Sequence, residues 1–136
     1  MEGTYPLPEA QLDRFLAKVL VPFPNLEELS GIIDRTTGLV DAHAEPVLDG
    51  PTLLAMQRTV RQVLLSEPVK RYALRLVLAT HPDSAHSTAA SRDFVRFGAS
   101  PRGAQSVILM ARVRALLAGR AQVAFDDVRA AAPAAL

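Results

Sequence analysis

The chain has 136 residues, enough for one domain of ordinary size and too few for two. Hydrophobic residues make up 49% and charged residues 21%, and 15 basic against 14 acidic side chains give a net charge of +1. These values are typical of a globular protein and argue against a disordered tail, a strongly basic nucleic-acid binder or a polybasic membrane anchor. The lack of cysteine excludes disulfides, a zinc ribbon and a thiol nucleophile. With no long apolar run and no signal-peptide pattern, we expect a cytoplasmic protein.

The first 24 residues differ from the rest because they contain four prolines, at positions 6, 8, 22 and 24. Proline limits any helix here to a short one that begins near Pro8. The apolar stretch Lys18–Val21 then predicts a short strand that ends at a proline. A single strand cannot satisfy its own backbone hydrogen bonds, and the remaining sequence offers no sheet. This indicates that the chain is a piece of a larger protein.

From residue 25 onward the sequence predicts a series of amphipathic helices. Asn25 followed by Glu28 is a capping-box pattern for the first of them, which Gly38 can close. Asp49 caps a second helix, and Pro68 opens a third. The apolar positions that recur at helical spacing are Leu26, Leu29, Ile32 and Ile33, then Leu53, Met56, Val60, Val63 and Leu64, then Val69, Tyr72, Ala73, Leu76 and Val77.

Residues 81–99 have the composition of a loop, with Phe94, Val95 and Phe97 available to anchor it to a core. Ser100 and Pro101 then predict the start of a long helix that ends at Gly119. This helix is apolar over most of its circumference, so we expect it to be the buried central one. A last short helix opens at residues 126–128 and ends near Pro133. The fold class is therefore mainly α, an antiparallel helical bundle.

Motifs for nucleotide phosphates, zinc hydrolysis and serine nucleophiles are all absent from the sequence. The three histidines, His43, His81 and His86, lie in predicted loops, so we expect no metal site. Arg14 either forms a surface pair with Asp13 or is presented to an anion. Arg102 is the second residue of a helix, where the positive end of the dipole favours an anion. It is either an ordinary exposed arginine or a ligand for a partner such as phosphate.

Three segments resemble MoxR-type AAA+ ATPases. Residues 2–15 (EGTYPLPEAQLDRF) are similar to the segment that follows sensor 1, and residues 98–103 (GASPRG) are similar to the sensor-2 motif. Gly119 and Arg120, with Val123 and residues 126–128 downstream, resemble the closing part of the lid. The resemblance runs from Glu2 to about Ala132, in the order of the family. The Walker A, Walker B and sensor-1 elements of the family precede this region, and the sequence does not contain them.

The resemblance implies a division of the chain and two residue roles. Residues 1–23 match the end of the AAA+ core, with the arginine-finger helix and the last core strand, and residues 24–136 match the helical lid. Arg14 matches the arginine finger, which acts in trans on the nucleotide of the next subunit of a ring. Arg102 matches sensor 2, which contacts the γ-phosphate from the lid.

The same resemblance implies ATP and Mg as cofactors of the intact protein, and chaperone-like remodelling of partners such as von Willebrand factor A-domain proteins. From the near-neutral charge and the lack of a long apolar run we expect no nucleic-acid and no membrane partner. We expect the isolated chain to hydrolyse no ATP, because it lacks the phosphate loop and the Mg-binding carboxylates. The alternative is a stand-alone helical protein-interaction module that does not use nucleotide; it would tolerate loss of Arg102. A helical DNA-binding domain fits poorly with the near-neutral charge.

Three parts of the chain depart from the family pattern. His81 stands where the family usually has arginine, which puts a contact at that position in doubt. Ala124 and Phe125 replace a Thr-Pro helix start, which removes an N-cap worth roughly 1 kcal/mol. The stretch from Asp83 to Arg92 matches poorly.

Overall fold

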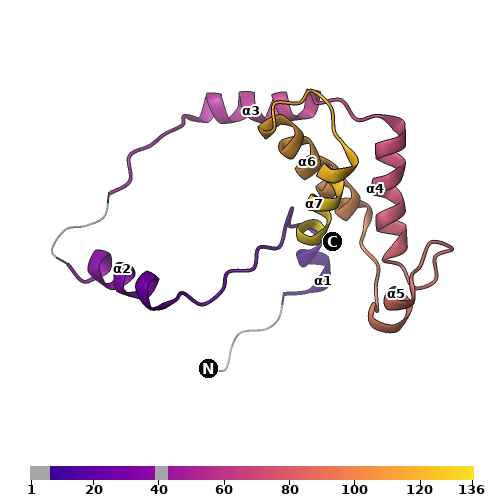
Figure 1. Cartoon of the computed structure of the whole chain (residues 1–136), viewed down its shortest axis with the longest axis horizontal. Helices are drawn as coiled ribbons and strands as arrows, with labels where there is room; N and C mark the ends of the chain where they lie inside the picture. Colours follow the sequence, from indigo (N-terminus) through magenta and orange to yellow (C-terminus); the bar gives the residue numbers. More distant parts are fainter. Residues whose placement is uncertain (1–6, 39–42) are drawn as a thin grey trace.

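The computed structural model describes residues 7–38 and 43–136, and in these ranges it contains helices and no strand. Residues 2–6 of the first resemblance segment lie outside the described residues. Figure 1 shows a group of packed helices beside a long extended N-terminal arm (residues 13–38) that carries one separate helix. The helices are α1 (Glu9–Leu12), α2 (Leu26–Thr36), α3 (Gly50–Gln62), α4 (Glu67–Ala79), α5 (Ala89–Phe94), α6 (Pro101–Leu117) and α7 (Phe125–Ala135).

The core surrounds α6, which packs against α3, α4 and α7. As the sequence predicted, α6 is the central helix, with five buried residues along its length. The buried side chains are small, so the helices approach each other closely and interdigitate without large aromatic fillers. The core consists of Val63, Val69, Ala73, Val107, Ala111, Ala115, Val123, Val128 and Ala131. The fold is thus the mainly α bundle expected from the sequence.

The two ends of α6 form as the sequence predicted. The side chain of Ser100 accepts hydrogen bonds from the backbone N–H groups of Arg102 (3.0 Å) and Gly103 (3.4 Å), and Pro101 occupies the first turn. At the other end Gly119 has φ +70°, and its N–H donates to the carbonyl of Leu116 at 2.9 Å. The Arg120 N–H donates to the carbonyl of Ala115 at 2.9 Å. These two bonds make a Schellman motif, which requires the left-handed conformation that glycine adopts without steric cost.

Replacing Gly119 with alanine is expected to lower the free energy of unfolding by about 1 kcal/mol. The reason is conformational, because a Cβ at φ +70° is strained although the space around this position is open. Urea unfolding of the two proteins measures the difference. Gly31, which lies in a helix with open space around it, is the matched control, and its replacement by alanine is expected to be neutral or stabilising. Equal stability of Gly119→Ala and the parent protein would contradict this account of the turn.

The connection between α3 and α4 pairs with the connection between α6 and α7. Leu64 and Gln122 form an isolated parallel bridge, in which the Leu64 N–H donates to the Ala121 carbonyl and the Val123 N–H donates to the Leu64 carbonyl, both at 2.9 Å. Helix α3 ends at Gln62, so Val63 and Leu64 belong to this connection rather than to the helix. Val63 and Val123, which flank the bridge on their two segments, are both buried in the core.

The N-terminal part differs from expectation in one respect. Helix α1 is short and begins after Pro8, as predicted, but residues 18–21 form no strand. Among described residues, the one backbone bond of this stretch is from the Lys18 N–H to the Ala134 carbonyl (2.7 Å), and Val19, Leu20 and Val21 are more than three-quarters exposed. A strand needs neighbouring strands to satisfy its backbone hydrogen bonds, and residues 18–21 have none within the described residues.

Helix α2 has the predicted capping box, with Asn25 and Glu28 bonded reciprocally at 2.9 Å. It ends at Thr36, with Thr37 rather than Gly38 at the cap. Figure 1 shows it lying well away from the packed helices, and none of its residues is buried. Its apolar face therefore does not join the bundle core that the sequence predicted for it.

The segment 81–99 is held by polar contacts and not by the aromatic side chains. Phe94 and Phe97 are 86% and 62% exposed, so the prediction that they anchor the segment is wrong, whereas Val95 is half-buried. Instead the segment contains α5, capped by Thr88, and the buried Ser91 hydroxyl donates to the Ala79 carbonyl at 2.5 Å. Composition predicted a loop because α5 is short and consists mainly of small and polar residues.

Helix α7 continues two residues beyond the predicted end. Pro133 lies inside its last turn, which the Leu136 N–H completes by donating to the Ala132 carbonyl at 2.9 Å. A proline this close to the helix end removes a single hydrogen bond, so the helix does not break there. This last turn carries Ala134, which binds the N-terminal arm.

Candidate functional site

Arg102 lies in the first turn of α6, where Ser100 and Pro101 fix the start of the helix. Its backbone N–H is used by the Ser100 cap, and its side chain is exposed. Within residues 7–38 and 43–136, no carboxylate forms an ion pair with its guanidinium. The structure therefore presents a free cation beside the positive end of a long helix, an arrangement that favours an anion from outside.

The residues that precede Ser100 are held firmly by the end of α4. The Ala99 N–H donates to the Thr80 hydroxyl at 2.8 Å, and His81 Nε2 lies 2.9 Å from the Ala99 carbonyl. The His81 ring packs so closely on Gly98 that a Cβ at that glycine would collide with it. His81, which departs from the family pattern, thus makes its own contact with the loop that positions the start of α6. This role could not be predicted from the sequence, because the contact joins residues 18 positions apart.

Arg14 lies in the turn directly after α1. The turn is closed by the Arg14 N–H to the Gln11 carbonyl and the Phe15 N–H to the Leu12 carbonyl, both at 3.1 Å. Its side chain is exposed and makes no ion pair with Asp13 or any other described carboxylate. The surface pair that was one interpretation of Arg14 is thus not formed, and the cation is available to a neighbour.

A hydrogen bond joins the turn that carries Arg14 to the helix that carries Arg102. The Ser100 hydroxyl donates to Oδ1 of Asp13, a contact between residues 87 positions apart. The Lys18–Ala134 backbone bond supports the same approach, and Figure 1 shows α1 beside the end of α7. Between these segments is a hollow of about 600 Å³, lined by Leu12, Asp13, Phe15, Ala17, Lys18, Ala99, Ser100, Gly103 and residues 133–136. Both arginines were candidate functional residues from the sequence, but the sequence did not predict that the segments carrying them lie in contact.

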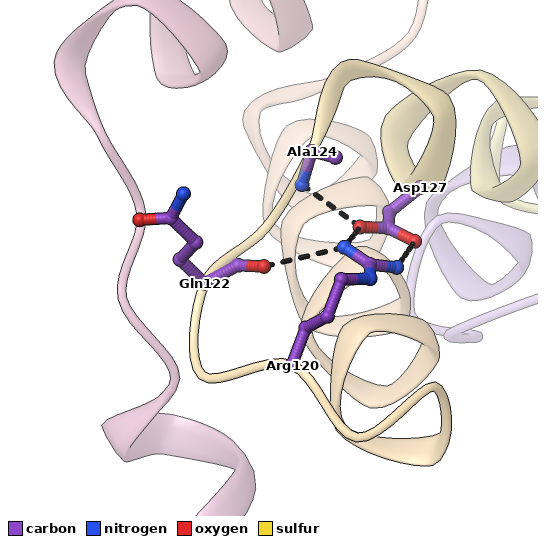
Figure 2. Close-up of polar contacts among 4 residues, drawn as sticks. All are labelled: Arg120, Gln122, Ala124 and Asp127. Atoms are coloured by element: carbon purple, nitrogen blue, oxygen red, sulfur yellow. Dashed lines mark hydrogen bonds and ion pairs between the residues drawn. The ribbon is translucent and has the colours of Figure 1, made fainter.

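A second polar cluster joins the turn after α6 to the start of α7 (Figure 2). Sequence analysis identified the segment that contains Arg120 and residues 126–128, but it did not predict the contact between Arg120 and Asp127. Arg120 donates two hydrogen bonds to the Asp127 carboxylate, at 2.7 Å and 2.6 Å, and a third to the Gln122 carbonyl at 3.3 Å. Asp127 is buried and also accepts from the Ala124 N–H at 2.8 Å. Its carboxylate thereby supplies half of a capping box to a helix whose cap residue, alanine, has no acceptor. The Asp at the third helical position was the available signal.

The Arg120–Asp127 pair has a clear electrostatic effect. The hydrogen bonds from Arg120 hold the pKa of the Asp127 carboxyl below its usual range, although burial acts in the opposite direction. The same pair raises the pKa of Arg120. Both groups are therefore charged at neutral pH, and the pair fixes the turn after α6 against the start of α7. We assign it to the architecture of the domain rather than to chemistry.

The part of the chain that the structure describes contains neither a metal-binding cluster nor a membrane-spanning helix. No three histidine, aspartate or glutamate side chains there gather in a way that suits a metal ion. None of the helices described combines the length and the apolar character needed to cross a membrane.

The chain is similar to proteins of known families. Residues 87–136, which include α5, α6 and α7, match the AAA lid domain. The chain is 39% identical over 127 residues to the chaperone MoxR1 of Mycobacterium tuberculosis, covering 93% of this chain and 33% of that protein. It is 32% identical over 140 residues to the protein MoxR of Paracoccus denitrificans, covering 95% of this chain and 41% of that one. The chain is homologous to the C-terminal part of MoxR-type AAA+ ATPases.

A solved structure has the same fold over nearly the whole chain. The crystal structure of a Cytophaga hutchinsonii protein assigned as an ATPase superimposes with a TM-score of 0.85 at 28% identity, covering 99% of this chain and 41% of that one. The helical arrangement is thus that of an AAA+ lid region together with the segments that precede it. The chain spans between a third and about two fifths of the length of these three proteins.

Proposed function

We propose that this chain supplies the arginine finger and the sensor-2 lid of a MoxR-type AAA+ ATPase that hydrolyses ATP with Mg and remodels partner proteins. Residues 1–23 are then the end of the AAA+ core, and residues 24–136 are the lid. In this proposal the nucleotide is held by core elements outside this sequence, and the chain supplies two cations to it. The isolated chain by itself hydrolyses no ATP.

The observation that carries the proposal is the setting of Arg102. A long helix with a fixed start carries an exposed guanidinium that no described carboxylate neutralises. A cation at the positive end of a helix dipole is unfavourable unless an anion is bound there, and a terminal phosphate supplies that anion. As sensor 2, Arg102 contacts the γ-phosphate of the nucleotide bound by its own subunit and links nucleotide state to the position of the lid.

Arg14 acts on a different nucleotide in this proposal. It is exposed on a turn, and it reaches the ATP of the neighbouring subunit in a ring, where it stabilises charge on the transferred phosphoryl group. The exposed apolar residues of the N-terminal arm support the same arrangement, because surface of this kind marks a contact with another folded unit. Here that unit is the rest of the AAA+ core and the next subunit.

The remodelling activity is proposed from the relatives, one of which is named a chaperone. The partners we propose are proteins with a von Willebrand factor A domain, and the location is the cytoplasm. Affinity capture with the ATP-bound complex and with the ADP-bound complex tests the partner class. Recovery of such a protein in the ATP state alone supports the proposal, and equal recovery in both states contradicts it.

The ATPase proposal is tested on the protein encoded by the complete open reading frame that contains these residues. Replacing Arg102 with alanine is expected to lower kcat/KM for ATP about a hundredfold, because a positioned donor to the transferring group is lost. Arg58→Ala, which removes an exposed arginine on α3, is the matched control and is expected to leave the rate unchanged. A silent Arg102→Ala would instead favour the stand-alone interaction module.

A further inference from the structure

The hydrogen bond between Asp13 and Ser100 connects the segments that carry the two arginines. Asp13 is one residue from Arg14, and Ser100 is two residues from Arg102. Asp13 precedes Arg14 in the turn after α1, and Ser100 caps the helix on which Arg102 is the second residue. The Ser100 hydroxyl accepts from two backbone N–H groups of α6 and donates its own proton to the Asp13 carboxylate. One side chain therefore fixes both the start of α6 and the turn that carries Arg14.

Few other polar contacts fix this turn. Among described residues, the bonds that join residues 7–24 to the packed helices are this one and the Lys18–Ala134 backbone bond. The residue before Ser100 is held separately, because Ala99 forms hydrogen bonds with Thr80 and His81. A movement of α6 at Ser100 therefore displaces Asp13, because a hydrogen bond joins the two residues. The rest of the N-terminal arm is exposed.

We propose that Asp13 and Ser100 are positioning residues for Arg14, linking the sensor-2 helix of each subunit to the arginine finger that the same subunit offers to its neighbour. This inference rests on the proposed function. It adds a regulation: nucleotide bound at the subunit's own site sets the position of α6, and the Asp13–Ser100 contact passes that position to Arg14. ATP binding in one subunit thereby controls hydrolysis in the next.

The link makes an unusual prediction for mixed rings. A nucleotide site needs Arg102 from the subunit that binds ATP and Arg14 from its neighbour, so Arg14→Ala and Arg102→Ala subunits complement each other. Ser100 lies on the sensor-2 helix, yet Ser100→Gly subunits are expected to behave like Arg14→Ala subunits. Their own sites stay intact, and what they lack is a well-placed finger.

The experiment measures ATPase activity of the complete protein in rings mixed from two variants. Ser100→Gly alone is expected to lower kcat about tenfold with KM for ATP nearly unchanged, because the finger is misplaced while nucleotide contacts remain. Glycine is accepted at an N-cap nearly as well as serine, so the helix start survives. Ser100→Thr keeps the hydroxyl and is expected to retain activity. Mixing Ser100→Gly with Arg102→Ala restores activity, and mixing it with Arg14→Ala does not.

The opposite pattern overturns the inference. If Ser100→Gly complements Arg14→Ala and fails with Arg102→Ala, then Ser100 acts through the sensor-2 arginine and not through the finger. The double variant Asp13→Ala with Ser100→Gly adds a second check, since partners in one contact are non-additive and the double loss should equal a single loss. Failure of Arg14→Ala and Arg102→Ala to complement each other would instead overturn the proposed function itself.

The contact is also tested in the chain alone, without ATPase activity. The sequence contains no cysteine, so spin labels attach only at introduced Gln11→Cys and Gln105→Cys, both exposed positions on α1 and α6. Pulsed electron paramagnetic resonance is expected to give a narrow distance distribution for the labelled parent and a broad one for its Ser100→Gly variant. Identical distributions would show that the hydroxyl does not hold the two segments together.

Discussion

Replacing Arg14 with alanine in the complete ATPase is expected to lower kcat about a thousandfold, the lower end of the range for an arginine finger. In the proposed function the guanidinium stabilises charge that develops on the transferred phosphoryl group, so its loss removes that stabilisation from the neighbouring site. ATP binding is expected to remain close to that of the parent protein, because each nucleotide is held mainly by its own subunit. Steady-state ATPase kinetics together with equilibrium nucleotide binding separate the two quantities.

The control for Arg14 is again Arg58→Ala, since that arginine is exposed and lies on α3. Arg14→Lys is a second comparison, because lysine keeps the positive charge but not the planar fork of donors. A recovery of less than tenfold by lysine supports a specific phosphate contact. A normal kcat for Arg14→Ala would remove the arginine finger from the account.

Replacing Asp127 with asparagine is expected to lower the free energy of unfolding of the chain by about 2 kcal/mol. Asp127 is 5% exposed and accepts two hydrogen bonds from Arg120, so asparagine removes the charge and turns an N–H₂ group toward donors. The loss stays below that of a fully buried pair because the Arg120 side chain is 39% exposed and can be hydrated. Asp126→Asn, in an exposed pair with Arg129, is the matched control and should change stability little.

The same variant predicts a pH dependence. Because Arg120 lowers the pKa of Asp127 in the folded state, its stabilisation is fully present above the ordinary pKa of about 3.9 and is lost as pH falls through the folded value. The difference between parent and Asp127→Asn, measured by urea unfolding, should therefore be constant at neutral pH and shrink below about pH 4. A difference that persists unchanged in strong acid would contradict this assignment of the charge.

Features set by neighbouring residues could be predicted from the sequence. Ser100 with Pro101 and Gly119 define both ends of α6, and Asn25 with Glu28 defines the start of α2, because caps depend on groups within one turn. The period of apolar residues also identified α4 and its buried face. The strand over residues 18–21 did not form, because strand formation depends on partners that a local pattern does not contain.

The site was predictable in part for the same reason. Arg14 and Arg102 were identified as candidates from their settings and from the resemblance, and their roles stay predictions. Their approach through Asp13 and Ser100 joins residues 87 positions apart and leaves no local trace. The prediction of how residues 81–99 are anchored failed for a related reason. The aromatic side chains suggested an apolar anchor, whereas Thr80, His81 and Ser91 hold the segment through hydrogen bonds.

In the proposed ATPase each active site combines Arg102 from one subunit with Arg14 from the next. The ATPase rate of an equal mixture of Arg14→Ala and Arg102→Ala subunits, each strongly impaired alone, tests this arrangement. Random assembly places an intact Arg102 beside an intact Arg14 at one boundary in four, so about a quarter of the parent activity should return. A double variant mixed with either single variant should give none. No recovery in the first mixture would contradict the claim.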